Sequence, residues 1–275
     1  MVMKQPKNEV YISSSSNNSI ESGDIKPCDS LKGYIDCYWY LIANASVISP
    51  FKISVTADGS FNIIFNLAQR KISDPIKIYG IPESCISLVA SDKTYILGIK
   101  FLPGGILSFL DLQASDFGSN SANLSDLIGS RADEIYDNLM LAENLRDKII
   151  FLENYLIGML NQRRLDVPAV IDKIKLELSR GRLITGEAIA DLSCVCERQV
   201  RRLFAQYIGV GPNEFIRMLR VQNAIHLLAM KKDVSFKELA LMTGHYDQSH
   251  FIKEFKKITG ITPAQFRRQL TLTRK

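Results

Sequence analysis

The sequence predicts an α+β protein that has a β-rich amino-terminal domain with flanking helices and an all-α carboxy-terminal domain. Three observations lead to this prediction. Short β-type runs broken by turn residues fill the first part of the chain, and helical periodicity fills the rest. In addition, the stretch Glu197–Arg217 is matched in residue type by Gln248–Arg268, 51 positions later. The carboxy-terminal domain is therefore expected to contain two copies of one helical unit.

Length and composition indicate a globular protein of two domains. The chain has 275 residues, of which 46% are hydrophobic, which is enough to bury a sizeable core. No apolar run approaches the roughly 20 residues of a membrane helix, and the start MVMKQPKNEV lacks the pattern of a signal peptide. We therefore expect a cytoplasmic protein without membrane contact. The cysteines are odd in number and scattered, which favours reduced thiols; they are Cys28, Cys37, Cys85, Cys194 and Cys196.

Residues 1–30 are expected to be disordered, and residues 31–130 are expected to be folded. The first segment contains the polar, Ser-rich run YISSSSNNSIESGD, which offers too little apolar area to offset its ordering entropy, so we expect disorder. The second contains six β-type runs bounded by turn residues such as Asp58-Gly59 and Asp74-Pro75. It is interpreted as a β-rich regulatory or effector domain. The runs are YIDCYWYLI, FKISV, FNIIFNL, IKIYGI, ISLVA and YILGIKF.

Residues 131–165 are expected to form a helical linker or dimerisation segment. Between Arg131 and Leu160, apolar residues recur at spacings of three and four, which predicts one long helix or a pair. This apolar stripe needs a partner, and two remain open: the β-rich domain of the same chain, or a second subunit.

Residues 166–275 are almost entirely helical in pattern. Thr185 is a suitable N-cap for a short helix, which a turn joins to a second helix with an exposed basic face, CERQVRRLFAQYIG. This is the helix-turn-helix arrangement, in which the second helix enters the major groove of DNA. The plan recurs in SFKELALMTG and DQSHFIKEFKKITG, with Asp247 as the expected N-cap.

A long helix joins the two units. It begins at Pro212 and runs for about 18 residues, or roughly 27 Å at 1.5 Å per residue. That length is close to the ~34 Å of one DNA turn, so the two second helices could occupy successive major grooves on one face of the duplex.

Charge is distributed unevenly along the chain. From Leu183 to Lys275 there are 15 Lys and Arg against 8 Asp and Glu, a net charge of +7. The rest of the chain has 19 against 21, a net charge of −2. A basic helical module is typical of binding to a polyanion such as DNA.

The carboxy-terminal residues resemble a known family. Residues 166–269 are similar to the DNA-binding domain of the AraC/XylS transcription regulators, through AIADLSC, ERQVRRLF, GVGPNEFIRMLRVQNAIHLL and ELALMTGHYDQSHFIKEFKKITGITPAQFR. The resemblance implies a sequence-specific regulator that binds promoter DNA. Two positions depart from the family pattern: His245 stands where a packed Phe is common, and Cys194 stands near a common Gly. CYWYL, ADGSFNIIFNL and GIKFLPGG are also similar to an amino-terminal domain of unsettled role that precedes this module in some members.

This interpretation assigns roles in DNA binding to particular residues. An Arg donates two hydrogen bonds to guanine, and a Gln can address adenine, so polar and basic side chains near the start of each second helix are the base-reading candidates. They are Arg198, Arg201, Arg202, Gln248, Ser249, His250 and Lys253. Basic residues further along are assigned to phosphates, which add affinity without sequence information. These are Arg217, Arg220, Lys256 and Lys257.

Other functions were weighed against this one. The amino-terminal domain shows no paired carboxylates at convincing spacing and no histidine, so an enzyme is disfavoured, although an enzymatic or protein-interaction module tethered to DNA is the alternative. HYDQSH superficially offers metal ligands, but its spacing is unsuitable, and we expect no metal or cofactor. Expected partners are double-stranded promoter DNA and RNA polymerase. A small-molecule effector and a second copy of the chain are further candidates.

Overall fold

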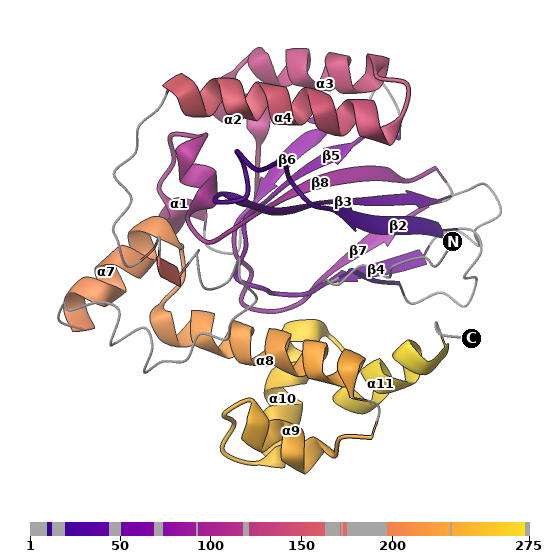
Figure 1. Cartoon of the computed structure of the whole chain (residues 1–275), viewed down its shortest axis with the longest axis vertical. Helices are drawn as coiled ribbons and strands as arrows, with labels where there is room; N and C mark the ends of the chain where they lie inside the picture. Colours follow the sequence, from indigo (N-terminus) through magenta and orange to yellow (C-terminus); the bar gives the residue numbers. More distant parts are fainter. Residues whose placement is uncertain are drawn as a thin grey trace.

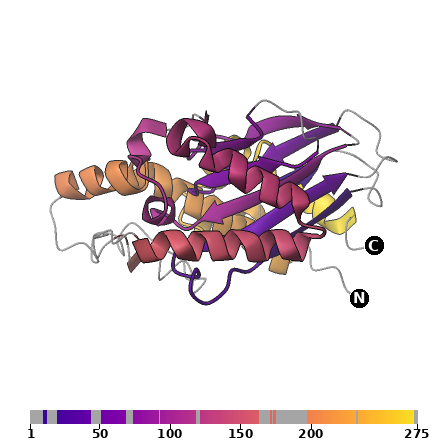
Figure 2. The ribbon, with the colours of Figure 1, turned by 90° about the horizontal axis from the view of Figure 1, so that it is seen from above.

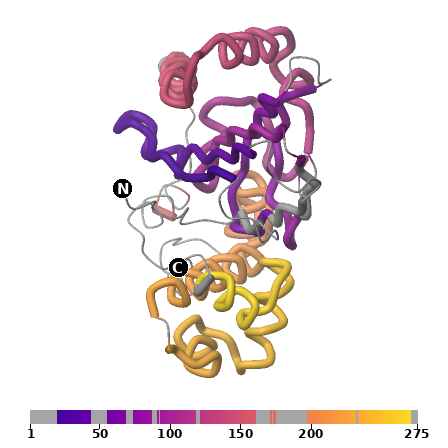
Figure 3. The backbone as a smooth tube through the Cα atoms, turned by 90° about the vertical axis from the view of Figure 1, so that its right-hand side faces the viewer, coloured from indigo at the N-terminus to yellow at the C-terminus, as the bar shows by residue number. Residues whose placement is uncertain are grey.

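The structure is a computed structural model, and it describes residues 10–12, 20–43, 51–68, 74–91, 93–117, 121–162, 171, 173–174, 197–231 and 233–272. Figure 1 shows two layers of strands with helices on either side. Helices α3 and α4 lie at one end of the molecule, and the carboxy-terminal helices lie at the other (Figures 1 and 3). None of the described helices has the length and apolar character that a membrane span requires.

The amino-terminal domain contains two antiparallel sheets. The larger has six strands in the order β2-β3-β8-β5-β6-β9, and the smaller has three in the order β1-β4-β7. The strands of the larger sheet are β2 (Ile20–Ile25), β3 (Ile35–Ala43), β8 (Tyr95–Phe101), β5 (Asn62–Asn66), β6 (Ile76–Tyr79) and β9 (Ser121–Asn123). Those of the smaller are β1 (Val10–Ile12), β4 (Phe51–Val55) and β7 (Ile86–Ala90).

All six predicted β-type runs are strands, and they correspond to β3 to β8. The expectation of disorder before residue 31 is wrong for β1, which pairs with β4 from Val10↔Val55 to Ile12↔Ile53. It is also wrong for β2, which pairs with β3 from Ile20↔Ala43 to Ile25↔Tyr38. Its IESGDI sequence is weakly apolar, but six consecutive backbone pairs to a central strand supply the order that composition does not indicate. The polar residues 13–19 lie outside the described residues.

The core of the domain lies on one side of the larger sheet and under its loops. Alternate residues of β5 are buried, as the period of two of a strand requires, whereas β8 is buried continuously from Leu97 to Phe101. The aromatic ring of Tyr38 on β3 is buried too. After β8, the Pro-Gly-Gly turn leads into a short 3-10 helix, η1 (Gly105–Ser108). Tyr34 packs edge-on against Phe109 just beyond it, with ring centroids 5.8 Å apart.

Helices cover one face of the larger sheet, as Figure 2 shows from above. They are α1 (Ala114–Phe117), α2 (Leu124–Ile128), α3 (Arg131–Leu141) and α4 (Leu145–Gln162). The apolar stripe predicted between residues 131 and 160 is therefore a pair of helices, and its central residues are buried within the same chain; they include Ile135, Leu139, Ile149, Leu152 and Leu156. Lys148 of α4 donates to the carbonyl oxygens of Leu139 and Ala142, which closes the end of α3.

The described carboxy-terminal helices are α7 (Glu197–Tyr207), α8 (Pro212–Met230), α9 (Phe236–Met242), α10 (Gln248–Thr259) and α11 (Pro263–Leu272). Local signals set their bounds. Pro212 occupies the first turn of α8, and Ser235 and Glu238 form a capping box at the start of α9. Gly260 ends α10 at a φ of 81°, in the left-handed region that favours glycine. The helix expected after Thr185 lies outside the described residues.

Candidate DNA-binding interface

Helix α7 presents a basic face to solvent. Val200 and Phe204 are buried, and the Phe204 ring packs edge-on against Phe215 of α8 with centroids 5.7 Å apart. The predicted base readers Arg198, Arg201 and Arg202 lie on the opposite face and are exposed. Arg201 also forms an ion pair with Glu197, one helical turn earlier, at 2.6 Å.

Helix α10 presents a second polar face in the same manner. Its buried side is an aromatic stack in which Phe251 meets Phe255, and Phe255 meets Phe266 of α11, both with centroids 5.7 Å apart. The Asp247 side chain accepts a hydrogen bond from the His250 backbone N–H at 2.7 Å, which confirms the predicted N-cap. The four predicted base readers of this helix are all exposed, namely Gln248, Ser249, His250 and Lys253. We call Glu197–Arg202 and Gln248–Lys253 the reading ends.

The carboxyl ends of both helices contact the amino-terminal domain. The backbone N–H of Ala57 donates to the Ile258 carbonyl and that of Cys85 to the Lys257 carbonyl, each at 3.1 Å. These carbonyls belong to the last turn of α10, where a helix leaves its oxygens without internal partners. At the end of α7, Gly209 lies so close to Ala114 that a Cβ would come within 2.7 Å of the Ala114 carbonyl oxygen. One domain therefore holds the carboxyl ends of both helices.

The loop that contacts α10 and α8 is buried and internally bonded. We call Thr56–Phe61 the docking loop; all its side chains are buried. Asp58 accepts a hydrogen bond from the Ser60 backbone N–H at 2.9 Å and forms a 2.6 Å ion pair with the buried Lys100 of β8. Gly59 has a φ of 82° and faces the Phe215 ring, which a Cβ would approach to 2.8 Å. Asp36 lies 3.4 Å from the same lysine, and although burial raises the pKa of Asp36, Lys100 and Lys26 lower it more.

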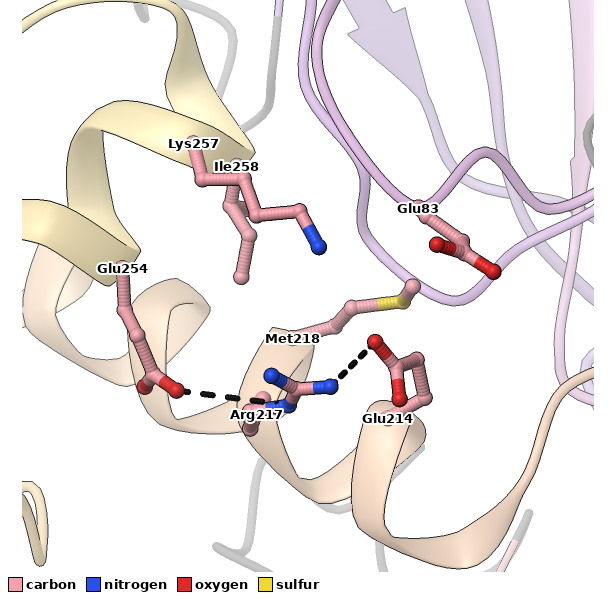
Figure 4. A pocket seen from close by; sticks show the side chains of 7 residues that line it. All are labelled: Glu83, Glu214, Arg217, Met218, Glu254, Lys257 and Ile258. Carbon is pink, nitrogen blue, oxygen red and sulfur yellow. Dashed lines mark hydrogen bonds and ion pairs between the residues drawn. The ribbon is translucent and has the colours of Figure 1, made fainter.

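The four predicted phosphate contacts are placed differently from one another. Lys256 is exposed on the last turn of α10, and Arg220 of α8 is half-buried beside Gly244. Arg217 and Lys257 line a small pocket where the two domains meet (Figure 4). Lys257 lies at the carboxyl end of α10, away from its reading end, and Arg217 belongs to α8. A phosphate role for these four residues stays a prediction.

The pocket between the domains is rich in charge. Glu214 hydrogen-bonds to Arg217 and raises the pKa of that guanidinium above its ordinary value. Figure 4 shows Glu83 of the amino-terminal domain facing the same space as Lys257. Arg217 also lies 4.0 Å from Glu254 of α10. Charged groups from α8, α10 and the amino-terminal domain thus meet at one place.

Glu254 was not among the residues predicted from the sequence. It is buried on α10 and lies 3.0 Å from the Nε2 atom of His245 and 3.5 Å from that of His250. The His245 side chain is fully buried, packs edge-on against Phe251, and takes the packed position that the family resemblance assigns to a Phe. Burial lowers the pKa of His245, and the Glu254 carboxylate opposes that effect. The available signal was a carboxylate four residues after His250, on the face that also carries Phe251 and Phe255.

Comparison with known proteins adds to this geometry. Residues 189–269 match a helix-turn-helix domain family, and residues 24–123 match a domain of unknown function. The chain is 31% identical over 103 residues to the probable transcription factor PqrA of Proteus vulgaris, which covers 38% of this chain and 84% of that protein. It is 30% identical over 125 residues to the transcriptional regulator MtrA of Neisseria gonorrhoeae, covering 45% of this chain and 39% of that protein. An uncharacterised regulator of Haemophilus influenzae is 33% identical, but only 28% of its length is covered.

Solved structures of ToxT from Vibrio cholerae align over most of the chain, but with little likeness. One, at 1.65 Å resolution, covers 92% of this chain and all of that one, with a TM-score of 0.41 and 17% identity. Another, described as bound to an unsaturated fatty acid, covers 94% and 98%, with a TM-score of 0.39 and 16% identity. The helix-turn-helix match, the coverage of PqrA and the exposed basic faces of α7 and α10 agree, and the chain belongs to the AraC/XylS family of transcription regulators.

Proposed function

We propose that this protein binds promoter DNA in a sequence-specific manner by inserting α7 and α10 into successive major grooves, under the control of its amino-terminal domain. The observation that supports the proposal is that both helices contact the amino-terminal domain at their carboxyl ends. Each has its carboxyl end against the amino-terminal domain and an exposed polar or basic reading end one helix length away. Helix α8 separates them by 19 residues, or about 28 Å, close to the ~34 Å of a DNA turn.

Specificity is proposed to come from the reading ends. Arg198, Arg201 and Arg202 would address guanine, and Gln248 would address adenine, while Ser249, His250 and Lys253 reach either a base or a phosphate. Arg201 forms an ion pair with Glu197, so we propose that it contributes less to base reading than Arg202 does. Exposed Lys256 is the best placed of the phosphate candidates. Arg217 and Lys257 would reach DNA only if the contacts between the domains changed.

Control is proposed to pass through the docking loop. Its backbone bond to Ile258, the contact of Gly59 with Phe215 and the fit of Gly209 against Ala114 connect one domain to both DNA-reading helices. A change in the amino-terminal domain would therefore alter the separation or orientation of the reading ends. As part of this proposal, a small-molecule effector or a second copy of the chain causes that change. RNA polymerase is the partner that responds to it.

The test is to recover and sequence the DNA that the purified full-length chain retains from sheared bacterial DNA at physiological salt. The proposal expects one recurrent motif with two conserved blocks whose centres are about one helical turn, 10 to 10.5 base pairs, apart. The variant Arg202→Ala with Lys253→Ala serves as the control and should lose the motif. Retention of DNA without any recurrent motif, by both proteins alike, would contradict the proposal.

A further inference from the structure

One carboxylate lies beneath the reading end of α10 and faces three side chains. Glu254 is 3.0 Å from His245 Nε2 in the turn, 3.5 Å from His250 Nε2 in the first turn of α10, and 4.0 Å from Arg217 Nε in α8. Burying a carboxylate costs free energy unless cations or hydrogen-bond donors face it. Its position is therefore determined by these three side chains together.

The buried His245 side chain stabilises this arrangement. The Thr243 hydroxyl donates to the Leu239 carbonyl oxygen at 2.6 Å, so its oxygen is left to accept from His245 Nδ1, 2.8 Å away. The imidazole also packs edge-on against Phe251 at 5.2 Å between centroids. The other ring nitrogen, Nε2, faces Glu254 at 3.0 Å. The ring cannot turn without breaking one of these contacts.

His250 lies at the upper edge of the same carboxylate. Its side chain is 47% exposed, and its ring centroid is 5.7 Å from that of His245. Because Nε2 is turned toward Glu254, the other ring nitrogen, Nδ1, is left for solvent or DNA. A neutral imidazole that donates through Nε2 is an acceptor at Nδ1.

We propose that Glu254 is a positioning residue for DNA reading, which holds His250 by Nε2 so that Nδ1 points to the major groove as a hydrogen-bond acceptor. This inference rests on the proposed function and deepens it. In the major groove only adenine and cytosine present an amino donor, at N6 and N4. His250 therefore selects an adenine or cytosine at one position of the site. A metal ion is a poor alternative occupant, because Arg217 faces the same carboxylate.

The experiment selects sequences from duplexes with a randomised segment, using the full-length chain and its variants. His250→Ala should lose a preference for adenine or cytosine at a single position, by about tenfold. Glu254→Met, which keeps the side-chain volume, should lose the same preference at the same position and keep the others. Combining the two should cause no further loss. Glu254→Gln should restore the preference, because its amide oxygen can take the place of the carboxylate oxygen that faces His250 Nε2.

Controls separate positioning from general destabilisation. Phe266→Leu loosens the aromatic stack of α10 without touching His250, so it should lower the unfolding temperature but leave every base preference in place. The imidazole ¹⁵N spectrum of the wild-type chain reports the tautomer directly, even where Glu254→Met fails to fold. Proton at Nε2 of His250 is expected, and a predominant Nδ1–H tautomer would overturn the inference.

The outcomes distinguish the two proposals. If the wild-type chain selects no sequence, sequence-specific DNA binding itself is wrong. If it selects a sequence, and Glu254→Met keeps the preference that His250→Ala loses, the function stands and the positioning role of Glu254 is wrong.

Discussion

The backbone N–H of Ala57 donates to the carbonyl oxygen of Ile258 at 3.1 Å, and this bond joins a loop of the β-rich domain to the last turn of a DNA-reading helix. A helix terminus normally leaves such a carbonyl to water or to a side chain. Here a second domain supplies the donor, and Cys85 supplies another to Lys257. The end of α10 is thereby completed by a part of the chain that does not read DNA.

The first prediction concerns this docking contact. Gly59→Ala should weaken it, because the new Cβ would lie 2.8 Å from the Phe215 ring on a backbone with a φ of 82°. Gly129→Ala is the matched control, since Gly129 also has a positive φ, 62°, but nothing lies within 4 Å of its Cβ position. Gly59→Ala should lower the free energy of unfolding by about 1–3 kcal/mol more than the control does. Urea denaturation measures both, and faster amide exchange at Ala57 should accompany the loss.

Reading-end charge is the subject of the second prediction. Arg202→Ala combined with Lys253→Ala should weaken duplex binding and reduce the slope of log affinity against log salt by about 2, because two phosphate or base contacts by cations are lost. Lys77→Ala with Lys93→Ala removes the same charge from exposed positions of the amino-terminal domain and should leave the slope unchanged. Gel-shift titration at several salt concentrations measures it. Equal slopes for both double variants would show that these reading ends do not bind DNA.

Sequence periodicity predicted the elements well because it is a local property. Runs of alternating or three-to-four spacing gave the strands β3 to β8 and the helices α8 and α10, and Asp247 was a correct N-cap. Strand β2 was missed because its order comes from pairing with β3, which no local pattern records. The contacts of Gly59, Asp58 and Glu254 were missed for the same reason. Each depends on a residue far away in the sequence or on a partner that only the folded chain brings near.

The third prediction addresses the buried ion pair that supports the docking loop. Lys100→Met leaves the Asp58 carboxylate buried without its cation at 2.6 Å, so the free energy of unfolding should fall by about 3–5 kcal/mol. Adding Asp58→Leu should recover part of that loss, because no unpaired charge then remains. Lys26→Ala is the control, since Lys26 is 69% exposed and pairs with Asp36 at the surface; its cost should stay below about 1 kcal/mol. Additive losses in the double variant would contradict coupling of the pair.

The fourth prediction follows from the pKa of Asp36. Burial raises this pKa, but Lys100 and Lys26 lower it more, so it lies below the ordinary value of 3.8 in the folded chain. A lowered carboxyl pKa contributes stability above the unfolded value, and that stability is lost as the pH falls through the folded value. Asp36→Asn should therefore destabilise the protein at neutral pH and make the free energy of unfolding less dependent on pH below 3.8. Urea denaturation of both proteins over this range measures the difference, and parallel curves would exclude the effect.

The last prediction separates helix stability from DNA reading by comparing the N-caps of two helices. Asp247 caps α10 through the His250 N–H at 2.7 Å, and Ser235 caps α9 through the Glu238 N–H at 3.1 Å. Replacing either by Ala should lower the free energy of unfolding by about 1 kcal/mol. Only Asp247→Ala frees the first turn of α10, where Gln248, Ser249 and His250 lie. Its duplex affinity should therefore fall more than that of Ser235→Ala at equal stability, and Asp247→Asn should restore it, because Asn is an equally good cap. Equal losses of affinity in the two Ala variants would mean that the first turn of α10 does not contact DNA.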